Sequence, residues 1–209
     1  MRQALLNAVN DCTSAAKQLT LPQTVSFIGD TAQLLADCFK RGNKVIIAGN
    51  GGSLCDAAHF AQELTGFFRG SRPALPAIAL TEQGHITCVA NDLGYDWVFS
   101  RGVEAYGKPG DVFVGLTTSG NSPNIINAVE VAKQLDLTTV AFLGKEGGKL
   151  KGVADLELLI DGFKTSDRVQ EAHMAAIHVI IEMVELLLFS KPEKACSEKI
   201  LGSMVPTST

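Results

Sequence analysis

The chain has 209 residues, enough for one sizeable α/β domain with a single buried core. Its hydrophobic fraction of 46% and charged fraction of 19% are typical of a soluble globular protein. The formal net charge is −4 and no run of Lys and Arg occurs, which argues against direct nucleic-acid binding. An anionic substrate would therefore need donors placed locally around it.

Neither end of the chain has the pattern of a membrane or export segment. Residues 1–19 are amphipathic and lack the apolar core of a signal peptide. The longest apolar stretch, around 180–189, is interrupted by Glu182 and Glu185. The five cysteines are odd in number and form no C-x-x-C pair, which argues against disulfides and a cysteine zinc site. We therefore expect a cytoplasmic protein with reduced cysteines.

Helical patterns and short apolar runs alternate along the chain. Helices are predicted over 2–19 and 23–41, and then over 53–67, 84–106, 122–135 and 166–188. Strands are predicted at 44–48, 76–80, 111–117, 138–143 and 156–160. Most of these strands are apolar at every position, which is typical of a parallel sheet covered by helices on both faces.

The pattern predicts one domain over 1–209. It consists of N-terminal helices (1–42), an α/β core (43–190) and a polar C-terminal tail (191–209), which we expect to be partly disordered.

A glycine-rich turn, GNGGS at 49–53, follows the first predicted strand. Glycines let the backbone approach a ligand closely. Ser53, with Asp56 three residues on, has the spacing of a helix N-cap and capping box. Ligands of open α/β sheets bind beyond the carboxyl ends of the strands, where a helix N-terminus offers free N–H donors. The turn is therefore a predicted phosphate site.

A second turn of this kind, TTSGNSP at 117–123, follows the third predicted strand. Ser122 is a natural N-cap, and Pro123 then falls at the first helical position. One such turn could be an ordinary connection, since Gly, Ser and Asn dominate turns. Two at adjacent strand ends favour an anion site. The first fits neither the Walker A motif nor the dinucleotide fingerprint.

Two predicted helices carry a set of possible acid–base or metal-binding groups. His59 and Glu63 are four residues apart on one helix face, and Gln170 and His178 lie about two turns apart on another. Imidazole, carboxylate and amide groups suit zinc or proton transfer. The spacing alone favours a surface pair and a core histidine, because nothing in it brings the two helices together. The two other histidines, His85 and His173, are expected to be structural or peripheral.

The sequence resembles the sugar isomerase (SIS) domain family and, within it, the bacterial phosphoheptose isomerases. The matching segments are AGNGGSLCDAAHFAQELTG (48–66), VANDLGYDWVFSRGVEAYGKPGD (89–111), GLTTSGNSPNIINAV (115–129), GKEGGKL (144–150) and DRVQEAHMAAIH (167–178). They occur in order over most of the chain, which makes the combination specific.

The resemblance implies a flavodoxin-like, five-stranded parallel sheet with helices on both faces. It implies an aldose–ketose isomerase that converts D-sedoheptulose 7-phosphate to D-glycero-D-manno-heptose 7-phosphate through an enediol, for lipopolysaccharide heptose. It further implies a homotetramer in which neighbouring subunits complete each active site, with no direct nucleic-acid or membrane partner.

The resemblance also assigns site residues. The ligands of one zinc ion per subunit would be His59, Glu63, Gln170 and His178. Glu63 would be the catalytic base and His178 its acid–base partner. Substrate contacts would fall on Asn50, Gly51, Gly52, Ser53, Glu63, Asn91, Asp92, Thr117, Thr118, Ser119, Ser122 and Gln170.

Two positions depart from the family pattern. Thr117 stands where many relatives have serine, and the hydroxyl is retained. Phe67 stands where relatives commonly have a basic residue, with Arg69 two positions on as a possible substitute. The identity of the sugar phosphate is therefore left open.

Three alternatives remain at the level of sequence. A non-catalytic relative binds the bacterial replication initiator and resembles this chain at RPALPAIALT (72–81), but it lacks the paired Glu and His that are present here as Glu63 and His178. A sugar-phosphate sensor of a transcription regulator would need a basic DNA-binding helix, and none is evident. An isomerase for arabinose 5-phosphate is disfavoured by the heptose-type motifs.

Overall fold

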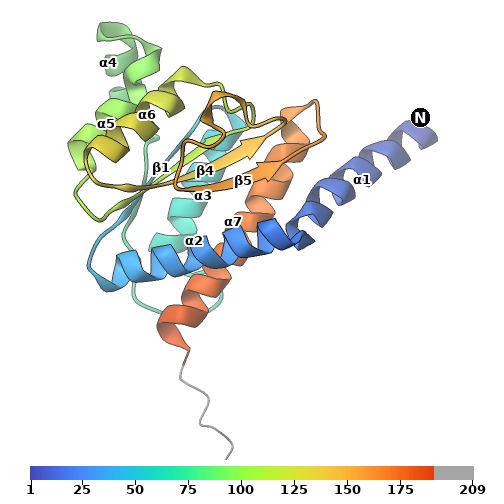
Figure 1. The fold of residues 1–209 in the computed structure, drawn as a ribbon, viewed down its shortest axis with the longest axis horizontal. Helices are drawn as coiled ribbons and strands as arrows, with labels where there is room; N and C mark the ends of the chain where they lie inside the picture. Colours follow the sequence, from blue (N-terminus) through green and yellow to red (C-terminus); the bar gives the residue numbers. More distant parts are fainter. Residues whose placement is uncertain (191–209) are drawn as a thin grey trace, which may run out of the picture.

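The computed structural model describes residues 1–190, which form a five-stranded parallel sheet between two layers of helices (Figure 1). The strands are β1 (Val45–Gly49), β2 (Ala77–Ala79), β3 (Val112–Thr117), β4 (Thr138–Gly144) and β5 (Leu156–Ile160). Their order is β2-β1-β3-β4-β5. This is the flavodoxin-like order, so the predicted fold class is confirmed. The order reverses between β1 and β3, where such sheets bind their ligands.

The helices agree with the predicted ranges with one exception. They are α1 (Arg2–Lys17), α2 (Pro22–Lys40), α3 (Gly52–Thr65), α4 (Gln83–Asp92), α5 (Val98–Tyr106), α6 (Pro123–Gln134) and α7 (Ser166–Phe189), with short 3-10 turns η1 (Gln18–Thr20), η2 (Tyr95–Trp97) and η3 (Gly148–Leu150). The single helix predicted over 84–106 is wrong. Gly94, at φ +101°, separates α4 from η2 and α5, because a helix cannot continue through that conformation. The predicted tail, 191–209, lies outside the described residues.

The two faces of the sheet carry separate apolar cores. Successive side chains of a strand point to opposite faces, and in β1 both sets are fully buried. On one face, Val45 and Ile47 join residues of α2, α3 and α7. On the other, Ile46 and Phe113 join residues of α5 and α6. Burial on both faces explains why the strands have no alternating polar pattern.

The last helix, α7, is part of the first of these cores. By length and composition it is the one helix within 1–190 that is apolar enough to cross a membrane. Ala176, Ile177, Ile180 and Val184 are nevertheless fully buried against the α2 and α3 side of the sheet. Its hydrophobicity is therefore that of a core helix.

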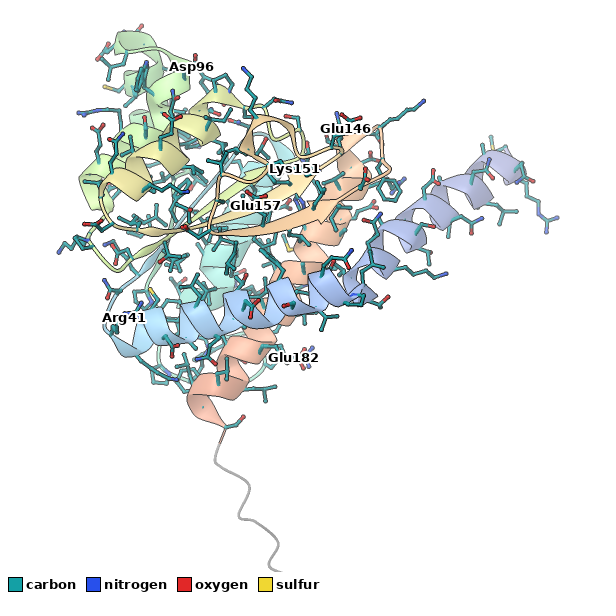
Figure 2. All side chains as sticks on the ribbon, in the orientation of Figure 1. Arg41, Asp96, Glu146, Lys151, Glu157 and Glu182 are labelled. Atoms are coloured by element: carbon teal, nitrogen blue, oxygen red, sulfur yellow. The ribbon has the colours of Figure 1, made fainter. Side chains whose placement is uncertain are left out.

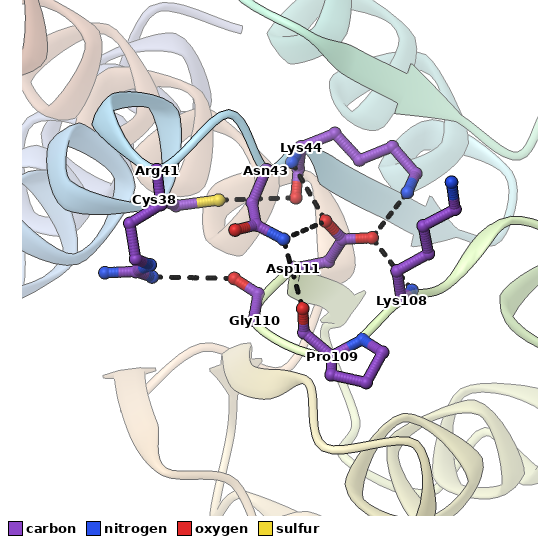
Figure 3. A network of polar contacts seen from close by, with 8 residues as sticks. All are labelled: Cys38, Arg41, Asn43, Lys44, Lys108, Pro109, Gly110 and Asp111. Carbon is purple, nitrogen blue, oxygen red and sulfur yellow. Dashed lines mark hydrogen bonds and ion pairs between the residues drawn. The ribbon is translucent and has the colours of Figure 1, made fainter.

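A buried ion pair fixes the amino ends of β1 and β3 (Figure 3). Asp111 accepts hydrogen bonds from the backbone N–H of Lys44 and the amide of Asn43, both at 3.0 Å, and its other oxygen pairs with the Lys44 ammonium. Burial raises the pKa of Asp111, but the hydrogen bonds from Lys44 and Asn43 outweigh it and the net pKa lies below the usual value. This network lies at the edge of the sheet opposite the predicted ligand site.

Helix α1 projects from the body of the molecule (Figure 1). Ala15 is its one buried residue. Leu5, Leu6 and Val9 are between 45% and 60% exposed. A stripe of exposed apolar side chains on an amphipathic helix is typical of a surface that another protein covers.

Candidate active site

The glycine-rich turn after β1 starts a helix, although not through the predicted cap. Gly51 is the N-cap at φ +56°, and Ser53 lies inside the first turn of α3, buried. The capping box predicted for Ser53 and Asp56 is therefore wrong, because the chain enters the helix two residues earlier, through the positive φ of Gly51. The N–H groups of the first turn of α3 still face the carboxyl edge of the sheet, as an anion site requires.

Gln170, on the first turns of α7, lies against this turn. Its amide nitrogen is 3.4 Å from the Ser53 hydroxyl. A Cβ atom on Gly52 would stand only 2.6 Å from the Gln170 amide, so any side chain at position 52 would displace it. The close approach explains this glycine and joins α3 to α7 at the carboxyl edge of the sheet.

The hydroxyl-rich turn after β3 has the predicted arrangement. Ser122 is the N-cap of α6 and Pro123 its first residue, as expected. The Ser122 hydroxyl is 3.1 Å from that of Thr117, and the Thr118 hydroxyl donates to Ser166 at the start of α7 over 3.0 Å. Ser119 accepts a hydrogen bond from the backbone of Asn121. Hydroxyls therefore gather at the starts of α6 and α7.

Gly120 brings a further loop against this turn. It has φ +64°, and a Cβ atom there would stand 1.7 Å from the carbonyl oxygen of Gly147. Beyond it lies a cavity of about 560 Å³, lined in part by Ser119, Lys145 and Lys164. Neither lysine was recognised from the sequence as a neighbour of this turn, because both follow later strands. Glu146 and Asp161 line the same cavity, so its formal charges balance, and the fold places two ammonium groups near the hydroxyls without a net positive charge.

Two side-chain amides connect the turns after β1 and β3. Asn50 and Asn124 each donate to the other's carbonyl oxygen over 2.9 Å, and the Tyr95 hydroxyl also donates to Asn50. Asn124 is buried, on the first turn of α6. Neither Asn124 nor Tyr95 was singled out from the sequence. Asn50 was predicted to contact substrate, and here its amide mainly holds the two turns together.

The structure brings His59, Glu63 and His178 into one cluster. The Nε2 atoms of His59 and His178, 119 positions apart in the chain, are 3.1 Å from each other. His59 Nε2 is also 3.3 Å from a carboxylate oxygen of Glu63. One ligand atom from each of the three lies within 4.8 Å of the others. Two imidazoles and one carboxylate form a known ligand set for catalytic zinc. Gln170 instead contacts Ser53.

The segment after α3 covers this cluster. The Phe68 ring lies 5.6 Å from that of His178, and the Arg69 guanidinium lies 5.5 Å from the Phe68 ring. Arg69 also pairs at 2.8 Å with Glu182. Glu182, labelled in Figure 2, lies on the C-terminal half of α7. Phe67 itself is 64% exposed. The structure thus directs Arg69 toward α7, one helical turn beyond His178, which the sequence could not establish.

Two predicted contact residues are not joined to either turn. Asn91 and Asp92 end α4, and the Asn91 amide donates to Asp92 over 2.7 Å. Among the hydrogen bonds of residues 1–190, none links them to the turns after β1 or β3. The 3-10 turn η2, which follows α4, contacts the turn after β1 because its Tyr95 hydroxyl donates to Asn50.

Asp56 lies in α3 one turn before His59. Within the described chain its Oδ2 atom is buried without a hydrogen-bond partner. Burial raises the pKa of Asp56 to about 6, and the positive field of His59 partly opposes this rise.

His85 and His173 are structural, as expected. His85 bonds the carbonyl of Val98 at 2.8 Å and His173 that of Leu143 at 2.9 Å. Complete burial lowers the pKa of His173 to about 4, although the bond to Leu143 acts in the opposite direction. Cys12, Cys38, Cys55 and Cys88 are free thiols, and Cys196 lies outside the described residues.

Comparisons with known proteins agree with these features. A family model described as SIS domain matches residues 11–144. The phosphoheptose isomerase of Fusobacterium nucleatum subsp. nucleatum is 60% identical over 167 residues, which are 80% of this chain and 84% of that protein. The phosphoheptose isomerase of Vibrio cholerae serotype O1 is 52% identical over 81% of this chain and 88% of its own. The solved phosphoheptose isomerase of Neisseria gonorrhoeae has a TM-score of 0.78 at 34% identity, over 88% of this chain and 98% of that one.

Proposed function

This chain belongs to the phosphoheptose isomerases of the SIS-domain family, and on that premise we propose that it interconverts D-sedoheptulose 7-phosphate and D-glycero-D-manno-heptose 7-phosphate. The observation that carries the proposal is the meeting of Glu63 and His178, from two different helices, in a single cluster, with Glu63 on the helix that begins at the glycine-rich turn. The non-catalytic alternative would have no use for this pair.

The phosphate of the substrate is proposed to bind at the carboxyl ends of β1 and β3. The first turns of α3 and α6 supply N–H groups and the positive ends of two helix dipoles. The hydroxyls of Ser53, Thr117, Thr118, Ser119 and Ser122 supply further donors. The ammonium groups of Lys145 and Lys164 lie in the neighbouring cavity, together with the carboxylates of Glu146 and Asp161. Gly51 and Gly52 leave room for the phosphate oxygens. Asn91 and Asp92 remain proposed substrate contacts.

The reaction moves a carbonyl from C2 to C1. Glu63 is proposed to remove a proton from C1 while His178 donates a proton to the C2 oxygen, which gives an enediol. His178 then removes the proton of the C1 hydroxyl, and Glu63 returns its proton to C2. Every proton removed is returned, so the two groups end the cycle as they began it. The 3.1 Å approach of His59 to His178 keeps the imidazole in place.

The donor set of the cluster fits a zinc ion. We propose that His59, Glu63 and His178 hold one ion per subunit, with Gln170 as a fourth ligand after its amide turns away from Ser53. A bound zinc ion would act as a Lewis acid that polarises the substrate carbonyl. Glu63 would be a weaker base while it is a ligand, so its ligation would have to change during turnover.

We further propose a cytoplasmic homotetramer. The exposed apolar stripe of Leu5, Leu6 and Val9 supports burial of α1 in contacts between subunits. Light scattering coupled to size exclusion would measure the mass, with a single 22.2 kDa chain as the contrary result.

A coupled turnover assay with sedoheptulose 7-phosphate, with and without a chelator, tests the function. Turnover is expected in the untreated protein, and the chelator shows whether the metal contributes. Absence of turnover in both conditions, with the protein folded, would favour the non-catalytic alternative and make Phe67 the first position to replace by arginine.

A further inference from the structure

We propose that Arg72 and Glu185 form a positioning pair that sets the distance between the helices carrying Glu63 and His178. The role builds on the proposed function, but Arg72 and Glu185 make no hydrogen bond to the substrate turns or to the side chains of His59, Glu63 and His178. The pair acts through the backbone at the end of α3 and through the body of α7.

Arg72 closes the C-terminus of α3. Its guanidinium donates to the carbonyl oxygens of Glu63 at 2.7 Å, Leu64 at 2.8 Å and Pro73 at 3.1 Å. The last carbonyls of a helix have no partner within it, and a cation there also complements the helix dipole. The backbone of the proposed base is therefore held directly by this side chain.

The same guanidinium pairs with α7. Arg72 Nε lies 2.5 Å from a carboxylate oxygen of Glu185, and the two side chains are only 3% and 14% exposed. Removing one partner of a buried pair is costly, because the other charge is left uncompensated. The connection between α3 and α7 at this point is therefore a strong one.

The pair lies at a point along α3 and α7 where it can set the distance between the two helices at the cluster. Helices α3 and α7 run in the same direction, because Ser53 meets Gln170 and, further along each helix, His59 meets His178. Glu185 follows His178 by seven residues, which is about two turns, so both lie on the face of α7 toward α3. Along the two helices, the cluster lies between the Ser53–Gln170 contact and the Arg72–Glu185 pair.

A change in the distance between α3 and α7 would lower the rate of proton transfer more than it would change the affinity for the substrate. Proton transfer requires reacting groups about 3 Å apart, and an error of about 1 Å can reduce the rate by about a hundredfold. The phosphate turns lie at the other end of α3, so substrate affinity should change little. Metal affinity should fall, because His59 and Glu63 come from α3 and His178 from α7.

The test compares Arg72→Met with a matched control, Lys44→Met. Lys44 also belongs to a buried ion pair, but that pair joins the starts of β1 and β3 and does not connect α3 with α7 (Figure 3). We expect Arg72→Met to lower kcat at least about tenfold with KM within about threefold, and to weaken Zn²⁺ binding about tenfold in a competition titration. Arg72→Lys keeps the positive charge but loses the several donors of the guanidinium. It should recover part of kcat and part of the Zn²⁺ affinity. Lys44→Met should lower stability and leave kcat, KM and Zn²⁺ affinity unchanged.

Glu185→Gln provides a milder variant should Arg72→Met fail to fold. It keeps the size of the side chain and is expected to change both readouts in the same direction, by about threefold to tenfold. The inference is overturned if the folded variants change kcat and Zn²⁺ affinity no more than Lys44→Met does. A wild-type protein without turnover would defeat the proposed function instead, and Zn²⁺ affinity would still decide the role of the pair.

Discussion

Asn50 and Asn124 exchange two hydrogen bonds of 2.9 Å through their side-chain amides. Asn50 follows β1, and Asn124 lies in the first turn of α6, after β3. The pair therefore spans the point where the strand order reverses. It sets the distance between the two turns proposed to share the substrate phosphate.

Asn124→Ala is expected to weaken substrate binding. The Asn50 amide loses its buried partner, which should lower the free energy of unfolding by about 1–3 kcal/mol and raise KM several-fold with a smaller change in kcat. Steady-state kinetics and urea denaturation would measure both. Asn127→Ala is the matched control, because Asn127 lies on the same helix but its amide donates to the carbonyl of Asp96. Equal KM values for the two variants would contradict the role of the amide pair.

Glu63→Gln should remove catalysis and preserve the fold. The substitution keeps the size of the side chain but removes the base, and general acid–base catalysis typically contributes about 10²–10⁴-fold to the rate. We expect kcat to fall by about that factor with an unchanged circular dichroism spectrum. Gln62→Ala, at the exposed neighbouring position, should retain wild-type turnover. An active Glu63→Gln enzyme would exclude Glu63 as the base.

Zinc is expected to stabilise the protein against heat. A ligand at a hundred times its Kd stabilises the native state by about 2.7 kcal/mol, which corresponds to a rise in Tm of about 5–10 °C for a chain of this size. Differential scanning calorimetry with and without a chelator would measure it. In His59→Ala the rise should be lost, while the metal-free Tm should change little because the His59 side chain is 41% exposed. A rise that persists in the variant would place the metal elsewhere.

His173 makes stability depend on pH. Because its folded pKa, about 4, lies below its unfolded value, the unfolded state binds more protons between these two values. Stability should therefore be greatest above about pH 6.5 and fall by roughly 3 kcal/mol as the pH decreases toward 4. His173→Gln keeps a donor for the Leu143 carbonyl but cannot be protonated. Urea denaturation across this range should show a smaller decrease for the variant, and identical slopes would contradict the assignment.

The strands and most helices could be predicted from local patterns, because β1, β3 and β4 are buried on both faces and largely apolar, and β2 and β5 are short runs of mostly apolar residues. The break at Gly94 could not, because apolar residues of α4 and α5 continue the helical period across it. Ser53 was misplaced for a related reason. Its type and spacing fit a cap, but the positive φ of Gly51 already starts the helix.

The sequence predicted which residues could form the site, but it could not predict which of them contact one another. His59 and Glu63 share a helix face, so their proximity follows from spacing. Their meeting with His178 depends on how α3 and α7 pack, which the local sequence does not encode. Arg72, Asn124 and the two lysines of the cavity went unrecognised for the same reason, since their partners are distant in the chain. Arg72 carried one usable signal, a basic residue shortly after a helix end.

The exposed stripe of α1 has a consequence for how this protein behaves on dilution. A helix of sixteen residues is marginally stable in water unless its apolar face is covered, and here a single residue of α1 is buried. If the cover is a second copy of the chain, α1 should lose helix as the protein is diluted, while the sheet and α7 remain. Far-ultraviolet ellipticity per residue would then vary with protein concentration, and the midpoint would give the dissociation constant of the assembly.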